Sequence, residues 1–166
     1  MKAILIAGAL ALMITLIGTR FAISVLVKQG YGQLIRDDGP TSHHTKRGTP
    51  TMGGLVVIVA VVIGYFTAKL ATNTAPSASA LLLLFLFAGL GMIGFLDDYI
   101  KVSKQRNLGL RSKAKLIGQT LIGLIFAVAA IGWEDDTGRT PITHAISFTR
   151  DIQGWKLPTA LLIIWV

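Results

Sequence analysis

The sequence predicts an all-α, polytopic integral membrane protein with four complete transmembrane helices and an incomplete fifth. The chain of 166 residues is 52% hydrophobic and only 14% charged, whereas a soluble domain is about a quarter charged. The charge deficit is concentrated in uncharged runs at 52–68, 70–96 and 116–133. An apolar run of about 18 or more residues is long enough to cross the hydrocarbon core as a helix. These runs predict a single membrane domain over 1–166.

The first helix is expected at 3–27. Its apolar stretch is longer than the roughly 7 to 15 residues of a signal-peptide core, so we interpret it as a retained helix. Arg20 lies inside it, where a charge is costly unless it reaches the interface or faces other helices. The sequence offers no explanation for Arg20.

The later helices are expected at 52–68, 80–96, 116–133 and 158–166. Pro158 suits the first turn of the last one, because proline lacks an N–H that this turn leaves unbonded. A helix over 158–166 would rise about 14 Å, about half the hydrocarbon thickness. We therefore expect the chain to be a fragment of a longer protein.

The loops predict the orientation. The connections 28–51 and 97–115 lie on the same side and hold ten of the 16 lysine and arginine residues. The positive-inside rule places both loops in the cytoplasm, with the N-terminus and the loop 134–157 outside. No basic run is interleaved with aromatic residues, so no nucleic-acid partner is expected. Cysteine is absent, which excludes a disulfide framework and a thiolate nucleophile.

Two adjacent carboxylates, Asp97 and Asp98, follow the third apolar run. Lys101 is four and three residues away from them, so on a helix it can neutralise either one. One interpretation is an ordinary helix end with charges at the interface. The other is a site for a hard divalent ion such as Mg²⁺, or a carboxylate acting as general base. The residues alone leave both open.

Two basic segments lie on the same side as this pair. The cations Arg111, Lys113 and Lys115 either hold their loop at the membrane surface and bind anionic lipids, or form a phosphate-binding rim. The segment TKRGTPTMGG (45–54) either is a capped loop or presents backbone N–H groups, Lys46 and threonine hydroxyls to an anion. The adjacent His43 and His44 make only a weak metal site.

Four stretches of the sequence carry a resemblance to a known family. KRGTPTMGG (46–54), with the preceding IRDDGPTSHHT, closely resembles the first signature of the bacterial phospho-N-acetylmuramoyl-pentapeptide transferases. GFLDDYIK (94–101), followed by LRSKAKLIGQ, is similar to the family's aspartate-rich segment and the loop beyond it. The family belongs to the polyprenyl-phosphate N-acetylhexosamine-1-phosphate transferase superfamily. The resemblance covers the whole chain but only about the first half of a family member.

The resemblance implies a function. These enzymes have about ten membrane helices and a cytoplasmic active site in the plasma membrane. They transfer phospho-N-acetylmuramoyl-pentapeptide from UDP-MurNAc-pentapeptide to undecaprenyl phosphate with Mg²⁺, giving lipid I and UMP. Asp97 and Asp98 match the family's catalytic aspartate pair, which is also a candidate metal site. The resemblance places the main metal ligand beyond Val166.

Four further residues match substrate-binding positions of the family: Lys46, Thr51, Lys101 and Lys113. The family's later motifs, including a further metal-binding aspartate and a histidine-rich loop, do not occur in this chain, so the chain alone is expected to be inactive. A homodimer is compatible with the sequence.

Two other functions remain open at this stage. One is a related transferase that uses a different UDP-N-acetylhexosamine and polyprenyl phosphate. The other is a small, non-catalytic membrane protein that only binds lipid phosphate.

Overall fold

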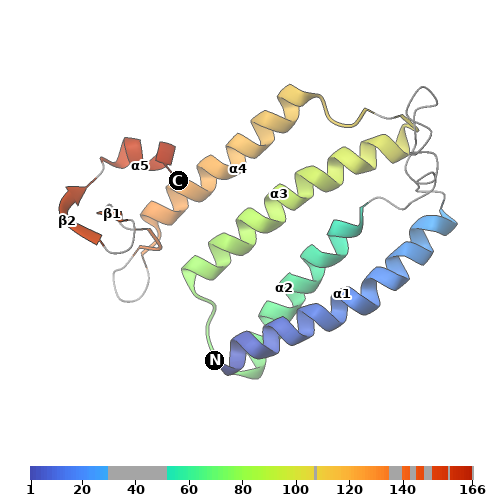
Figure 1. The fold of residues 1–166 in the computed structure, drawn as a ribbon, viewed down its shortest axis with the longest axis horizontal. Coiled ribbons are helices and arrows are strands. Elements are labelled where there is room, and N and C mark those ends of the chain that lie inside the picture. The colour runs from blue at the N-terminus through green and yellow to red at the C-terminus, as the bar shows by residue number, and fades with distance from the viewer. Residues whose placement is uncertain are drawn as a thin grey trace.

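The computed structural model describes residues 1–29, 52–106, 108–134, 140–142, 145–147, 151–156 and 158–165. Four long helices come first: α1 (Lys2–Lys28), α2 (Gly53–Ala71), α3 (Ala78–Ser103) and α4 (Ser112–Gly132). Two short strands and a short helix follow: β1 (Ala145–Ser147), β2 (Asp151–Lys156) and α5 (Thr159–Trp165). In Figure 1, the four long helices run alternately up and down, each beside the next in the chain.

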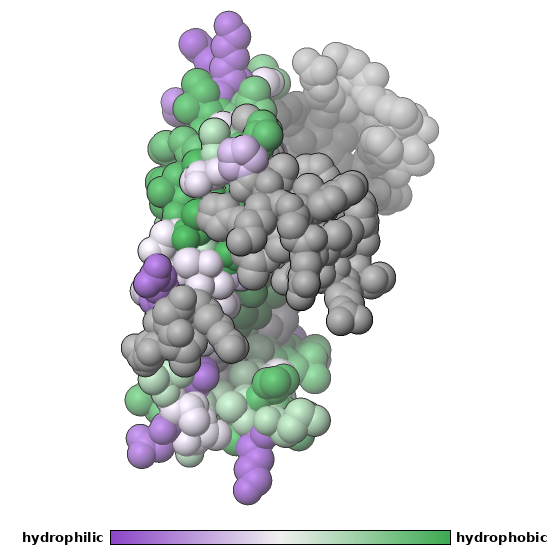
Figure 2. All heavy atoms as spheres, turned by 90° about the vertical axis from the view of Figure 1, so that its left-hand side faces the viewer, coloured by the Kyte–Doolittle hydropathy of each residue, from purple (hydrophilic) through white to green (hydrophobic). Residues whose placement is uncertain are grey.

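Each of the four long helices is long and apolar enough to cross a membrane. The expected class, a polytopic helical membrane protein, is therefore confirmed. Figure 2 shows one side of the molecule, where apolar side chains cover much of the surface and most hydrophilic ones stand at its upper and lower ends. Large apolar side chains such as Leu16 and Phe21 are exposed. A bilayer would cover these side chains.

The observed helix ends differ from the expected ranges by one to seven residues. Helix α4 begins at Ser112, before the expected start at 116. Its first turn carries Lys113 and Lys115, which a search for uncharged runs leaves out. The last helix, expected at 158–166, is observed as α5 over Thr159–Trp165, and Val166 lies outside the described residues.

A small β-hairpin lies in the segment 134–157, which was predicted only as a loop. Strands β1 and β2 pair antiparallel, with Ala145 opposite Lys156 and Ser147 opposite Asp151. The three residues of β1 are too few for a recognisable alternation of apolar and polar positions, and the six residues of β2 do not alternate, since Ile152 and Trp155 are three positions apart. The pairing satisfies backbone groups in a connection between helices and leaves the membrane-spanning part entirely helical.

Small residues bring α1 and α2 into close contact. Ala60, Gly64 and Ala68 follow one another at four-residue spacing on α2, and all three are buried. A Cβ atom on Gly64 would lie 2.9 Å from the carbonyl oxygen of Ala7 and 3.0 Å from the backbone nitrogen of Ala11. The two backbones thus approach more closely than larger side chains would allow. Such small-residue interfaces are typical of membrane helices, where dispersion contacts between backbones drive association.

The alternating directions bring four helix ends together. The end of α1, the start of α2, the end of α3 and the start of α4 lie at the same end of the bundle, toward the upper right of Figure 1. Ser77 is the N-cap of helix α3, and its hydroxyl accepts a hydrogen bond from the Ala80 amide at 3.4 Å. It continues to Ser103, beyond the expected end at 96. Asp97 and Asp98 therefore lie on the last turns of a helix instead of after it.

Candidate functional site

Asp97 is the central group of the candidate site. It is the one buried charged residue in the part of the chain that the structure describes, with 8% of its surface exposed. Its Oδ2 lies 2.7 Å from Lys101 Nζ and 3.5 Å from Lys115 Nζ. Its Oδ1 accepts a hydrogen bond from the Leu110 amide at 2.9 Å. A buried carboxylate needs such partners, because an uncompensated charge is costly away from water.

Asp98 has a different environment. Its Oδ1 accepts a hydrogen bond from Lys101 Nζ at 3.1 Å, and its side chain is 34% exposed. Lys101 therefore bridges both carboxylates, as its spacing predicted. Among the described residues, Lys101 is the only ion-pair partner of Asp98, whereas Asp97 pairs with two lysines. Asp98 is thus the carboxylate with more capacity left for a ligand.

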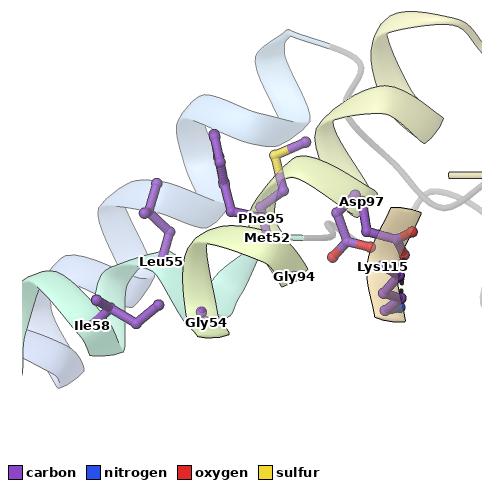
Figure 3. Close-up of a pocket in the computed structure, with 10 residues that line it drawn as sticks. Met52, Gly54, Leu55, Ile58, Gly94, Phe95, Asp97 and Lys115 are labelled. Carbon is purple, nitrogen blue, oxygen red and sulfur yellow. Dashed lines mark ion pairs between the residues drawn. The ribbon is translucent and has the colours of Figure 1, made fainter. Parts of the chain in front are cut away.

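A cavity of about 370 Å³ adjoins the two carboxylates. Asp97, Asp98 and Lys115 line its charged end, and Leu55, Ile58 and Phe95 line its apolar part. Figure 3 shows Asp97 on α3 and Lys115 on α4 pointing toward each other, with Leu55 and Ile58 contributed by α2. The cavity therefore combines a charged end with an apolar wall, which suits an amphiphilic ligand.

Two glycines leave this cavity open. A Cβ atom on Gly54 or Gly94 would meet no atom within 4 Å, and both residues line the cavity. Close packing does not require glycine at these two positions, and the absence of a side chain leaves space within the site.

Just before Gly53, Met52 has a φ angle of 73° at the N-cap of α2. This left-handed conformation is uncommon for a residue with a side chain.

Lys115 is the site residue that the sequence analysis did not single out. From the sequence, Lys115 was predicted only as part of the basic rim, and Lys113 was the lysine that the resemblance predicted as substrate-binding. Both residues lie in the first turns of α4, but Lys115 faces Asp97 whereas Lys113 is exposed. Helices α3 and α4 pack side by side. The helical period alone does not show which side of α4 faces α3, so it could not identify the lysine that contacts Asp97.

The other predicted residues divide into two groups. Asp97, Asp98 and Lys101 come together at one end of the bundle, as expected. Lys46, Thr51, His43 and His44 lie outside the described residues. The roles assigned to all of these residues stay predictions.

The two carboxylates fit a divalent cation in part. Within the described ranges, no cluster of three or more histidine, cysteine or acidic residues could enclose a metal ion. A magnesium-type site needs fewer protein ligands, since one or two carboxylates and the phosphate oxygens of a substrate usually hold the ion. Asp98, with Lys101 as its single ion-pair partner there, offers suitable hard oxygen ligands. The donor chemistry therefore fits an ion shared with a phosphate ligand.

The main metal ligand that the resemblance places beyond Val166 is not part of this sequence. It therefore stays a prediction, and Asp97 and Asp98 are the candidate ligands that this chain itself supplies.

The fold and this site define a class of protein. It is a multi-pass helical membrane protein with two carboxylates, two lysines and an amphiphilic cavity at one end of its bundle.

Comparisons with known proteins identify the family. Residues 46–58 match the family model described as phospho-N-acetylmuramoyl-pentapeptide-transferase signature 1. The chain is 61% identical to a phospho-N-acetylmuramoyl-pentapeptide-transferase of Nocardioides sp. (strain ATCC BAA-499 / JS614), in an alignment that covers 100% of the chain and 47% of that relative.

A second relative with the same name, from Cutibacterium acnes, is 57% identical over 100% of the chain and 47% of its own length. A third, from Streptomyces avermitilis, is 52% identical over 99% of the chain and 46% of its own length. No solved structure matches the chain. Over its whole length, the chain belongs with the N-terminal portion of the phospho-N-acetylmuramoyl-pentapeptide-transferase family, and it spans about half the length of the curated relatives it matches.

Proposed function

We propose that the protein containing this chain transfers phospho-N-acetylmuramoyl-pentapeptide from UDP-MurNAc-pentapeptide to undecaprenyl phosphate, giving lipid I and UMP. The name of the relatives, at up to 61% identity, supports this reaction. The observation that carries the proposal is the Asp97–Asp98 pair, which is bridged by Lys101 and joined by Lys115 beside a cavity with an apolar wall. Such a site suits two phosphate-bearing substrates, one of which is a lipid.

The charges of the site fit the chemistry. In the proposed reaction, an oxygen of the lipid phosphate forms a bond to the sugar-linked phosphorus, and the bond from that phosphorus to the UMP oxygen breaks. Both reactants are anions, so cations at the site are needed to bring them together. Lys101 and Lys115 supply two positive charges within 4 Å of the carboxylates. Asp98, the more open carboxylate, is the better placed to orient the lipid phosphate or accept its proton.

Mg²⁺ is the proposed cofactor. Asp98, with Asp97 as a second carboxylate, would hold the ion together with substrate phosphate oxygens. When bound, the ion neutralises phosphate charge and stabilises the departing UMP.

The membrane placement is also a proposal. We infer that the protein lies in the plasma membrane with the site on the cytoplasmic face and the N-terminus outside. The positive-inside rule supports this orientation, because the connections 28–51 and 97–115 join the helix ends that surround the site.

The test is release of UMP by the full-length protein in detergent, with UDP-MurNAc-pentapeptide, undecaprenyl phosphate and Mg²⁺. We expect UMP release in the wild type and a loss of about 10²-fold or more in Asp98→Asn, the range typical of a removed acid–base group. Asp97→Asn should cause a loss of similar size, because it removes the charge that pairs with Lys101 and Lys115. Glu134→Gln is the matched control, because Glu134 is an exposed carboxylate beyond the opposite end of α4. Its activity should equal that of the wild type.

The same assay separates the alternatives. Activity with UDP-N-acetylglucosamine in place of the muramoyl substrate would assign the protein to the related transferases. A folded protein that binds undecaprenyl phosphate but releases no UMP would overturn the proposal and favour a lipid-phosphate-binding protein.

A further inference from the structure

The turn between α3 and α4 folds back onto the candidate site. It includes Leu108, Gly109 and Leu110 and leads into α4 at Ser112. The Leu110 amide donates a hydrogen bond to Asp97 Oδ1 at 2.9 Å, across thirteen positions of sequence. A hydrogen bond to an ionised group is stronger than one between neutral groups. The turn is therefore attached to the carboxylate through its own backbone.

Gly109 makes this attachment sterically feasible. A Cβ atom on Gly109 would lie 2.6 Å from the carbonyl oxygen and 2.7 Å from Cγ of Asp97, and it would also overlap Oδ1. The carbonyl oxygen belongs to the backbone of α3 and does not move like the end of a flexible side chain. By contrast, the main obstacle to a Cβ on Gly91 is the terminal methyl of Ile58. Of these two glycines, only Gly109 is fixed against a helix backbone.

Together these contacts hold Asp97 from three directions. Lys101 approaches from its own helix, Leu110 from the turn and Lys115 from α4. The Leu110 amide binds Oδ1, and the two lysines face Oδ2. Both oxygens of Asp97 thus have fixed partners on separate segments, which determines the plane of the carboxylate.

We propose that Gly109 and the Leu110 amide are positioning groups for the Asp97 carboxylate. A turn without a side chain at 109 lets the amide reach Oδ1 and keeps Oδ2 directed toward Lys101 and Lys115. The carboxylate and the two lysines then meet a phosphate ligand in one fixed arrangement. The effect on turnover rests on the proposed function, whereas the attachment of the turn to Asp97 does not.

Hydrogen exchange at the Leu110 amide tests the attachment directly in the full-length protein. In the wild type we expect this amide to exchange at least about ten-fold more slowly than in an unstructured peptide, as a charge-assisted hydrogen bond implies. Asp97→Asn keeps an acceptor oxygen and should retain part of this protection. Asp97→Ala removes the acceptor and should abolish it.

Kinetics test the positioning role. Gly109→Ala should lower kcat about ten-fold or more while KM for the UDP substrate changes less than about three-fold, because misplacing Asp97 and the two lysines that it contacts affects the transition state more than binding. The matched control is Gly123→Ala on α4, where a Cβ would meet no atom within 4 Å. This variant should keep both constants and the exchange rate of the Leu110 amide.

Two results would overturn the proposal. One is a Leu110 amide that exchanges in the wild type as fast as in an unstructured peptide, or equally fast in the wild type and in Asp97→Ala. The other is an active Gly109→Ala variant with an unchanged kcat. If Gly109→Ala does not fold, the Asp97→Asn and Asp97→Ala pair still decides the attachment. If the wild type releases no UMP, the proposed function fails while the exchange measurement still reports on the turn.

Discussion

Among the described residues, two glycines lie against backbone atoms of another segment, and their contacts differ in kind. Gly64 on α2 faces the backbone of α1 around Ala7 and Ala11. Gly109, between α3 and α4, faces the backbone and carboxylate of Asp97. The first contact lies between two apolar helices, and the second joins the backbone of a turn to a buried charge.

The difference separates stability from site geometry. At Gly64, close approach increases dispersion contacts along two helices, and no charged group is involved. At Gly109, close approach serves one hydrogen bond to a carboxylate that two lysines also contact. Enlarging Gly64 should therefore lower the stability of the protein with little effect on turnover of the folded molecules. Enlarging Gly109 should affect turnover first.

The largest expected effect on stability is that of Gly64→Leu. The new side chain would enter the space occupied by the α1 backbone, and overpacking of this kind typically costs about 1–3 kcal/mol or more. Thermal unfolding of the full-length protein in detergent should show a Tm several degrees lower. UMP release per folded molecule should stay close to that of the wild type.

Gly8→Leu is the control for this change. Gly8 lies on an exposed part of α1, where a Cβ would meet no atom within 4 Å. The Tm of this variant should remain near that of the wild type. Equal Tm values for Gly64→Leu and the wild type would show that the α1–α2 contact does not limit stability.

A smaller effect is expected when the two lysines of α4 are compared. Lys115→Met removes one cation from Asp97, while Lys101 remains 2.7 Å from the same carboxylate. We expect kcat/KM to fall about ten-fold, which corresponds to about 1.4 kcal/mol. Lys113→Met, two residues earlier on the same helix, should change kcat/KM less than about three-fold, because Lys113 is exposed. The kcat/KM values of both variants are measured from the kinetics of UMP release.

The opposite order would support the substrate-binding role that family resemblance gives to Lys113. It would also show that the Asp97–Lys115 contact, at 3.5 Å, contributes little to turnover.

The sequence predicted the helical class and the grouping of Asp97, Asp98 and Lys101 because both follow from local patterns. Uncharged runs of sufficient length identify membrane helices, and an i,i+4 spacing places Lys101 beside Asp97. No local sequence pattern indicates which lysine of α4 faces α3, since that depends on the rotation of one helix against another. Lys115 was therefore found only in the structure.

The positioning role of the turn could not be predicted for a similar reason. Gly109 in NLGLRS has the appearance of an ordinary loop glycine. Its close approach to Asp97 depends on the return of the chain onto α3, which brings residues thirteen positions apart into contact. The β-hairpin within 134–157 was missed because β1 is too short to show a pattern and the six residues of β2 do not alternate between apolar and polar.

The smallest effect is expected for Gly18→Ala, which tests whether the whole α1–α2 contact is equally tight. A Cβ at Gly18 would lie 3.0 Å from Val56 Cγ1, the end of a side chain, whereas at Gly64 it would meet backbone atoms. Alanine is favoured over glycine within a helix by about 1 kcal/mol, which offsets a small shift of the valine. The Tm of Gly18→Ala should therefore stay within about 2 °C of the wild type, and that of Gly64→Ala should fall further. If the Tm of both variants falls by the same amount in the same assay, close approach is required along the whole interface, and the tight contact is not centred on Gly64.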